Sequence, residues 1–163
     1  MMDKKNEMYN FYLTAKGGWE VISGISMYPV LKHGWMVKMQ PVTENDVEIG
    51  DIVGFGQNIL TCHRIVGRMK FLNKTYFLHK GDNALVGGMF EGKDLIGKVT
   101  AVSDNKGQKV NKEKWQKPKC RNIKIINYSY LFIYLIRKSI FPGEKIDRLA
   151  NLFDKFFWIF LLR

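Results

Sequence analysis

The sequence predicts a mainly β protein, built as a sandwich or barrel-like sheet, with a short N-terminal helix and an apolar helical hairpin at the C-terminus. Between residues 19 and 102, short apolar runs rich in Val, Ile, Phe and Tyr alternate with Gly, Asn and Asp. Such runs, separated by turn residues at close spacing, are typical of antiparallel sheets. Strands are expected at residues 35–39, 51–55, 59–66, 71–78 and 95–102, with Asn73-Lys74 at a hairpin tip.

The segments on either side of this region have helical patterns. Met8, Phe11, Tyr12 and Ala15 recur on one helical face, and the two glycines that follow at 17 and 18 would end that helix. We therefore divide the chain into an N-terminal helix at 1–18, a β domain at 19–105, a basic linker at 106–122 and a helical hairpin at 123–163.

The predicted hairpin carries a wide apolar surface that something must cover. Its first helix holds an uncharged run at 125–136, shorter than the ~20 residues that a membrane-spanning helix needs. Its second helix has one apolar stripe, formed by Ile146, Leu149, Ala150, Phe153, Phe156, Phe157, Phe160 and Leu161. The hairpin either packs on protein, on the sheet or on a second copy of the chain, or lies in a membrane interface with its basic residues facing anionic lipid.

The formal net charge of +11 over 163 residues suggests an anionic partner: a membrane surface, a nucleic acid or an acidic peptide. The basic segment 103–121 lacks interleaved aromatic residues apart from Trp115, which disfavours nucleic acid. Cys62 and Cys120 match no metal or redox spacing. The first 16 residues contain no continuous apolar segment of the kind that a signal peptide or anchor needs.

Ser26 is the candidate nucleophile. Gly24 precedes it by two residues and Pro29 follows it by three, and both residue types bend the backbone. A small hydroxyl on such a bend can stand clear of its neighbours. A serine becomes a nucleophile when a nearby base removes its proton during the attack.

Two later stretches offer partners for this serine. His63 lies inside an apolar run and can act as the base, since its reference pKa lies near neutral pH. Asp82, in a turn after the next run, can hold the other ring nitrogen and steady the imidazolium. Taken singly, each residue also fits a structural role, and His33 and His79 are rival bases.

Five ordered stretches resemble the boxes of type I signal peptidases of the S26-like serine peptidase family. They are Gly24-Ile25-Ser26-Met27-Tyr28-Pro29-Val30-Leu31, Ile49-Gly50-Asp51-Ile52-Val53, His63-Arg64-Ile65-Val66, Lys80-Gly81-Asp82-Asn83 and Ile96-Gly97-Lys98-Val99. The chain is similar to the branch that carries histidine where the bacterial enzymes carry lysine, as in archaeal and endoplasmic-reticulum signal peptidases. The resemblance covers residues 19–102, about half of the chain.

The resemblance implies a β-rich fold shared with the self-cleaving repressor LexA, in which residues 19–105 form a catalytic domain. By position, Ser26 resembles the nucleophile, His63 the general base and Asp82 the acidic partner. Arg64 and Lys80 resemble structural members of their boxes. We expect the oxyanion and substrate-binding segment at Gly24, Ser26, Met27 and Pro29.

The implied substrate is a precursor polypeptide or leader peptide, bound as an extended strand along a sheet edge, with small side chains just before the cut. No metal or organic cofactor is implied. The implied location is the membrane, and specifically the cell membrane, with the hairpin in contact with lipid; action on a soluble leader from the cytoplasmic side is the alternative. Nucleic acid is not an expected partner, and homo-oligomers are compatible with the apolar hairpin.

The chain departs from the family pattern at three points. Bacterial members carry a serine that helps to hold the oxyanion two positions before the nucleophile, where this chain has Gly24. The histidine branch has a second aspartate soon after the Gly-Asp-Asn box, and here the nearest acids are Glu91 and Asp94. Family members commonly have an N-terminal anchor, which is not visible here.

These departures keep two alternatives open. The first is a catalytically lapsed module of the same fold that binds or scaffolds peptides. The second is a relative of the self-cleaving repressors. It is disfavoured because those proteins use a lysine base and carry a DNA-binding domain, for which the first 18 residues leave no room.

Overall fold

The computed structural model describes residues 17–56, 59–84 and 87–116. Within them, strands paired antiparallel form one seven-stranded sheet in the order β1-β2-β7-β3-β4-β5-β6. The strands are β1 (Trp19–Val21), β2 (Met36–Gln40), β3 (Ile52–Phe55), β4 (Thr61–Phe71), β5 (Lys74–Lys80), β6 (Gly87–Glu91) and β7 (Leu95–Ser103). The mainly β prediction is therefore confirmed for this part of the chain.

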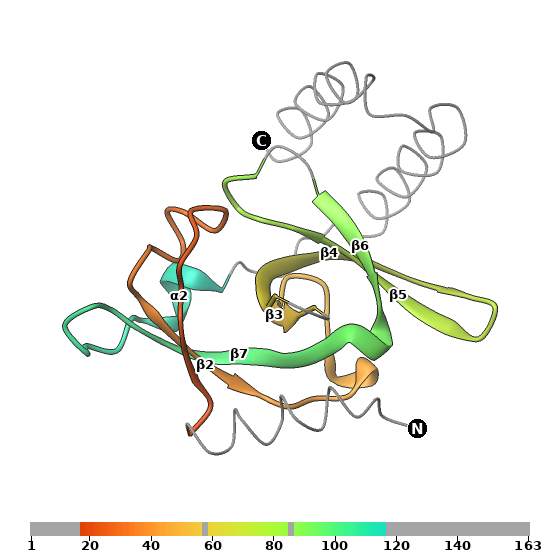
Figure 1. Cartoon of the computed structure of the whole chain (residues 1–163), viewed down its shortest axis with the longest axis horizontal. Coiled ribbons are helices and arrows are strands. Elements are labelled where there is room, and N and C mark those ends of the chain that lie inside the picture. Colours follow the sequence, from red (N-terminus) through yellow and green to blue (C-terminus); the bar gives the residue numbers. More distant parts are fainter. Residues whose placement is uncertain (1–16, 57–58, 85–86, 117–163) are drawn as a thin grey trace.

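The sheet curls strongly around its central strands. Figure 1 shows β7 crossing the middle of the molecule, with β2 on one side and the β4–β5 ribbon reaching away on the other. Register shifts interrupt the pairing at Lys38/Met39, Gly54/Phe55 and Ile65/Gly67. An extra residue on one strand of a pair bends that strand and increases its twist, which explains the curl.

The predicted strands correspond to β2, β3, β4, β5 and β7 with shifted ends. The hairpin between β4 and β5 turns at Leu72-Asn73, one residue earlier than expected, with φ of 46° and 60°. Two successive positive φ angles match the right-handed twist of a two-residue hairpin. The sequence pattern missed β1, which is only three residues long, and β6, which begins with two glycines.

Two apolar clusters lie on the two sides of the sheet. The first joins the loop after β1 to the central strands and contains Ile22, Met27, Leu31, Val37, Met39, Ile52, Ile96, Val99, Val102 and Trp115. The second contains Val47, Val53, Phe55, Ile65, Phe77, Phe90 and Leu95. Consecutive residues such as Ile52 and Val53 fall in different clusters because successive strand side chains point to opposite faces.

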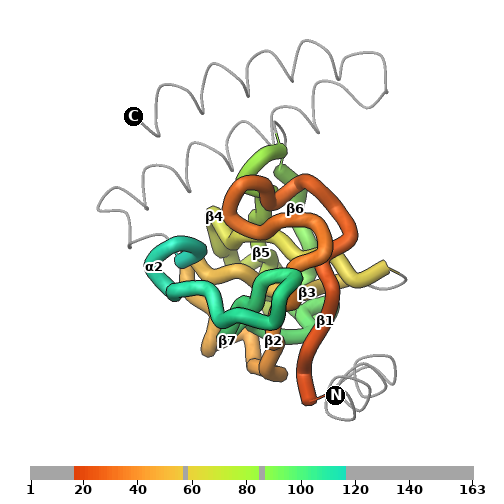
Figure 2. The backbone as a smooth tube through the Cα atoms, turned by 90° about the vertical axis from the view of Figure 1, so that its left-hand side faces the viewer, coloured from red at the N-terminus to blue at the C-terminus, as the bar shows by residue number. Residues whose placement is uncertain are grey.

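The loop between β1 and β2 folds back over the sheet and is fixed at its base and its middle. Figure 2 shows this loop, drawn in red-orange, arching over the strands. At its base, Ile22 N–H donates to Trp35 O and Gly34 N–H to Ile22 O, both at 2.8 Å. In its middle, the fully buried side chains of Met27 and Leu31 anchor it to the first cluster.

The first part of the segment expected to be a basic linker packs on the domain. Residues 112–115 form the short helix α2 (Lys112–Trp115), capped by the Asn111 side chain, which accepts from Glu113 N–H. Trp115 is 4% exposed and belongs to the first apolar cluster. A buried tryptophan outweighs the solvation of the lysines around it, so the domain extends at least to this residue.

Residues 1–16 of the predicted N-terminal helix (1–18) and the whole predicted hairpin (123–163) lie outside the described residues. Among the described residues, none of the helices has the length and apolar character needed to cross a membrane.

Candidate active site

Ser26 lies on the turn that follows β1, and the Gly81-Asp82-Asn83 turn holds it in place. Asn83 N–H donates to Ser26 O at 2.7 Å, and the Asn83 side-chain amide donates to Ile25 O at 3.3 Å. A Cβ added to Gly81 would lie 2.5 Å from Ser26 O, so any larger residue there would displace the serine. The segments 24–31 and 80–83, which are distant in the sequence, are thus in direct contact.

His63, on β4, faces the serine. Its Nε2 lies 2.9 Å from Ser26 Oγ, within hydrogen-bond distance. The histidine is held at its position by the pairing of β4 with β3, where it lies opposite Val53. Its ring also approaches Phe55, with centroids 6.1 Å apart. This arrangement places a proton acceptor next to a hydroxyl, as a serine nucleophile requires.

His79, on β5, occupies the other side of the His63 ring. The two Nδ1 atoms are 2.9 Å apart. His79 packs beside the stacked rings of Phe55 and Phe90, with ring centroids 4.4 Å and 5.8 Å away. Gly88, its partner on β6, leaves room for the ring, because a Cβ there would lie 2.7 Å from His79 Nε2.

The three side chains fit one set of tautomers. If Ser26 donates its hydroxyl proton to His63 Nε2, the proton of a neutral His63 lies on Nδ1 and is donated to His79. His79 Nδ1 then accepts, and its own proton lies on Nε2. The contacts form a line from hydroxyl to imidazole to imidazole.

Burial keeps both imidazoles neutral near pH 7. It lowers the pKa of His63, while the charge of Asp82 acts in the opposite direction. Burial, with a smaller contribution from His63, lowers the pKa of His79 to about 4. A neutral His63 is the form that can accept a proton, and its lowered pKa extends that form into mildly acidic solution.

Asp82 holds Arg64 instead of contacting His63 Nδ1. Its two carboxylate oxygens accept from Arg64 Nε and Nη2 at 2.9 and 2.6 Å, and both side chains are almost fully buried. Arg64 also donates to the carbonyls of Gly50 and Trp115. The expectation that Asp82 orients His63 directly differs from this geometry, in which His79 takes that place and Asp82 acts on His63 through its charge.

The other expected binding residues are distributed around the serine. Gly24 and Met27 line the cavity beside Ser26, whereas Pro29 is exposed and lines a separate surface hollow with Trp35 and Lys114. Within the described part of the chain, the N–H groups of Ser26 and Met27 take part in no hydrogen bond of the turn. These two donors are therefore available for an oxyanion.

The rival residues have other partners. His33 Nδ1 lies 2.9 Å from the carbonyl of Ser23 on the loop surface. Glu91 forms ion pairs with Lys74 and Lys93, which lower its pKa. Burial raises the pKa of the Cys62 thiol to about 12, so Cys62 is protonated and a poor nucleophile at neutral pH.

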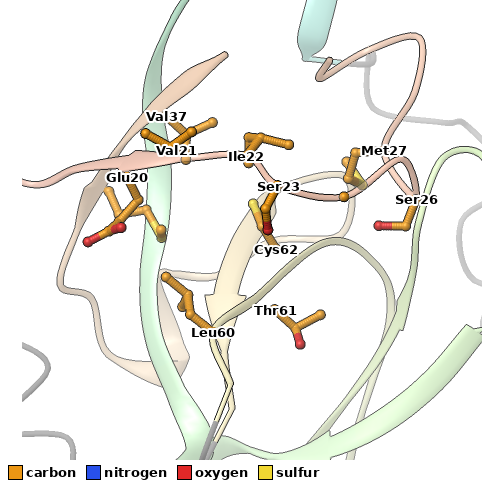
Figure 3. Close-up of a pocket in the computed structure, with 12 residues that line it drawn as sticks. Glu20, Val21, Ile22, Ser23, Ser26, Met27, Val37, Leu60, Thr61 and Cys62 are labelled. Carbon is orange, nitrogen blue, oxygen red and sulfur yellow. The ribbon is translucent and has the colours of Figure 1, made fainter. Parts of the chain in front are cut away.

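A cavity of about 170 Å³ opens beside Ser26. Figure 3 shows Ser26 at one end and Glu20 at the other, with Ile22 and Val37 above and Leu60 and Thr61 below. Strand β1, which forms one wall, pairs only with β2 among the described strands, so its outer edge is open to an added strand. Among the described residues, no three His, Cys, Asp or Glu side chains are grouped to hold a metal ion.

No family model, no curated protein and no solved structure matches this chain.

Proposed function

We propose that the protein is a serine endopeptidase of the signal-peptidase type, which removes signal or leader peptides from precursor polypeptides. The observation that carries the proposal is the 2.9 Å contact between Ser26 Oγ and His63 Nε2, formed by residues 37 positions apart. The resemblance of the five boxes points to the same two residues. In this proposal the domain has the fold of the signal peptidases and LexA, and His79 takes the place of the acidic partner.

The proposed reaction uses only side chains, the peptide and water. Ser26 Oγ attacks the scissile carbonyl carbon while its proton passes to His63 Nε2. The C–N bond breaks when the His63 imidazolium returns that proton to the leaving amine. A water molecule, deprotonated in turn by His63, hydrolyses the acyl ester and restores Ser26.

His79 supports His63 without supplying a full negative charge. As a neutral acceptor it fixes the His63 tautomer and receives the Nδ1 hydrogen bond when His63 becomes an imidazolium. The charge of Asp82 also favours the imidazolium, although Asp82 binds Arg64. We therefore expect a weaker base than a histidine paired with a carboxylate, and one that operates at lower pH.

The substrate in this proposal lies as an extended strand along the open edge of β1. Main-chain hydrogen bonds to the edge supply affinity, and the cavity between β1 and the start of β4 selects side chains. The segment at 123–163 is proposed to bring the enzyme to the membrane through its apolar and basic residues.

The test is cleavage of a leader-peptide library by the purified full chain. Ser26→Ala and His63→Ala are each expected to lower kcat/KM by about three orders of magnitude or more. His33→Ala is the matched control, since His33 contacts the same loop but does not line the cavity, and it should retain activity. Cleavage that persists in Ser26→Ala or His63→Ala would reject the assignment.

A catalytically lapsed peptide-binding module is the second candidate. The observation in its favour is that a neutral imidazole stands where a carboxylate would stabilise His63 most strongly. Peptides would then bind in the cavity with no cleavage in any variant, and an electrophilic serine reagent would leave Ser26 unmodified.

A further inference from the structure

Glu20 places a carboxylate at a core-facing position. Along β1, Val21 is 60% exposed, whereas the side chain of Ile22 is buried in the first cluster. Side chains alternate along a strand, so Glu20 shares the inward face with Ile22 and lies opposite the fully buried Val37. An apolar residue is the usual occupant of such a position.

One oxygen of this carboxylate finds no partner in the described part of the chain. Oε1 is withdrawn from solvent, and none of the described residues donates a hydrogen bond to it. Among the described residues, the ion pairs join other groups, and Lys38 points to the opposite face of the sheet from Val37. A carboxylate that has lost part of its hydration without gaining a donor is unfavourable for folding, unless something that the chain binds offsets the loss.

Glu20 lies in the wall of the cavity beside Ser26. Glu20 and Ser26 line opposite ends of that cavity, as Figure 3 shows. Glu20 as a whole is only partly buried, so a group inside the cavity can approach it. The cavity volume of about 170 Å³ is enough for several water molecules. The cavity can therefore hold a side chain larger than the methyl group of alanine.

We propose that Glu20 selects peptides with a lysine or arginine side chain at the third residue before the cleaved bond, while the side chain directly before that bond stays small, an inference that rests on the proposed function. Inward side chains of an extended peptide recur every two residues, about 6.6 Å apart, the same repeat that separates Ile22 from Glu20. A peptide whose cleaved bond lies at Ser26 places its last inward side chain beside Ile22 and Met27. The next inward side chain then lies beside Glu20, where a cation forms an ion pair with the carboxylate.

Binding to the Ser26→Ala full chain tests this selection without requiring catalysis. The probes are two fluorescent extended peptides with alanine before the cleavable bond and either lysine or norleucine at the third residue before it. We expect the lysine peptide to bind at least about tenfold more tightly in fluorescence anisotropy, since a hydrogen bond to a charged group has about that effect. Adding Glu20→Gln should remove most of the difference, whereas adding Glu113→Gln, on α2 and outside the cavity, should leave it unchanged.

Equal affinities for the two peptides, a preference that survives Glu20→Gln, or no binding of either peptide would each overturn the proposal. The outcome is separable from that of the peptidase assay. Cleavage without a lysine preference contradicts only the selection by Glu20. A lysine preference in binding without cleavage by the wild type contradicts only the peptidase assignment.

Thermal unfolding gives an independent readout. Glu20→Met fills the same space without a charge and should raise the Tm of the unliganded chain, because it removes a poorly satisfied carboxylate from a core-facing position. A lower Tm would show that the carboxylate stabilises the fold through a partner of its own, and this result would contradict the proposal.

Discussion

Two neighbouring residues on β4, His63 and Arg64, have opposite electrostatic environments. Arg64 forms two hydrogen bonds with Asp82 and two with backbone carbonyls. His63 contacts a hydroxyl and a second imidazole, and burial lowers its pKa. The strand alternation separates the two sites, so one face carries a fixed ion pair and the other a group that can exchange protons. The hydrogen bonds of Arg64 fix its position, which suits a structural role. His63 can gain and lose a proton, as a catalytic base must.

The largest expected effect concerns the Arg64–Asp82 pair. Asp82→Asn leaves a buried guanidinium without its counterion, so we expect a loss of about 3–5 kcal/mol in the free energy of unfolding, measured by urea titration. Glu91→Gln, which breaks the surface ion pairs with Lys74 and Lys93, is the control and should be far less destabilising than Asp82→Asn.

The same variant distinguishes a structural Asp82 from a catalytic one. The double replacement Arg64→Met with Asp82→Leu should be less destabilised than either single replacement, since no unpaired charge remains. If Asp82→Asn instead left stability unchanged and lowered kcat by about four orders of magnitude, Asp82 would be the direct partner of the base, and the assignment of His79 would be wrong.

An intermediate effect is expected at His79. His79→Phe keeps an aromatic ring beside Phe55 and Phe90 but removes the acceptor for His63 Nδ1, so kcat should fall about 10- to 100-fold with little change in KM. The acid limb of the kcat profile should also shift, which a role in packing alone would not cause.

Gly88→Ala tests the role of His79 by a second route. The added Cβ would lie 2.7 Å from His79 Nε2 and would push the ring away from His63, so its kcat should fall in the same direction as in His79→Phe. Unchanged kcat in both His79→Phe and Gly88→Ala would remove His79 from the mechanism.

The smallest effect is a pH dependence of stability. Because the pKa of His79 is lowered to about 4 from 6.5, the unfolded chain binds the proton more readily than the folded chain between these two values. Stability therefore falls as the pH drops through this window, by about 1 kcal/mol from pH 7 to pH 5.5 for this residue. Urea titrations at the two pH values should show the loss in the wild type and a smaller loss in His79→Phe. An equal loss in both would assign the pH dependence to other groups.

The sequence predicted the β class, most of the strands and the Ser26–His63 pair as candidates, because short apolar runs and local turn residues carry that information. It could not assign the contact of His63 Nδ1. His79 lies on the same face as His63 only through the register of β4 with β5, in which Ile65 is opposite His79, and a register shift follows directly. Strand register depends on the whole sheet, so no local pattern could rank His79 above Asp82.

The partner of Asp82 could not be predicted from the sequence for the same reason. A turn aspartate next to glycine suits a catalytic acid as well as a salt-bridge partner, and the choice depends on which β4 side chain faces it. Arg64, beside His63 in the sequence, faces Asp82 because the strand alternates. The resemblance includes Gly81 and Asn83 in one box, but only the folded chain shows that Asn83 N–H donates to Ser26 O and that Gly81 leaves no room for a Cβ beside it.

Covalent labelling by a fluorophosphonate reagent, mapped by mass spectrometry on the full chain, tests the central claim most directly. We predict one adduct, on Ser26, in the wild type and in Ser23→Ala, and a labelling rate at least about 100-fold lower in His63→Ala, because the imidazole is the base that activates the hydroxyl. An adduct on another residue, no adduct at all, or an unchanged rate in His63→Ala would contradict the account.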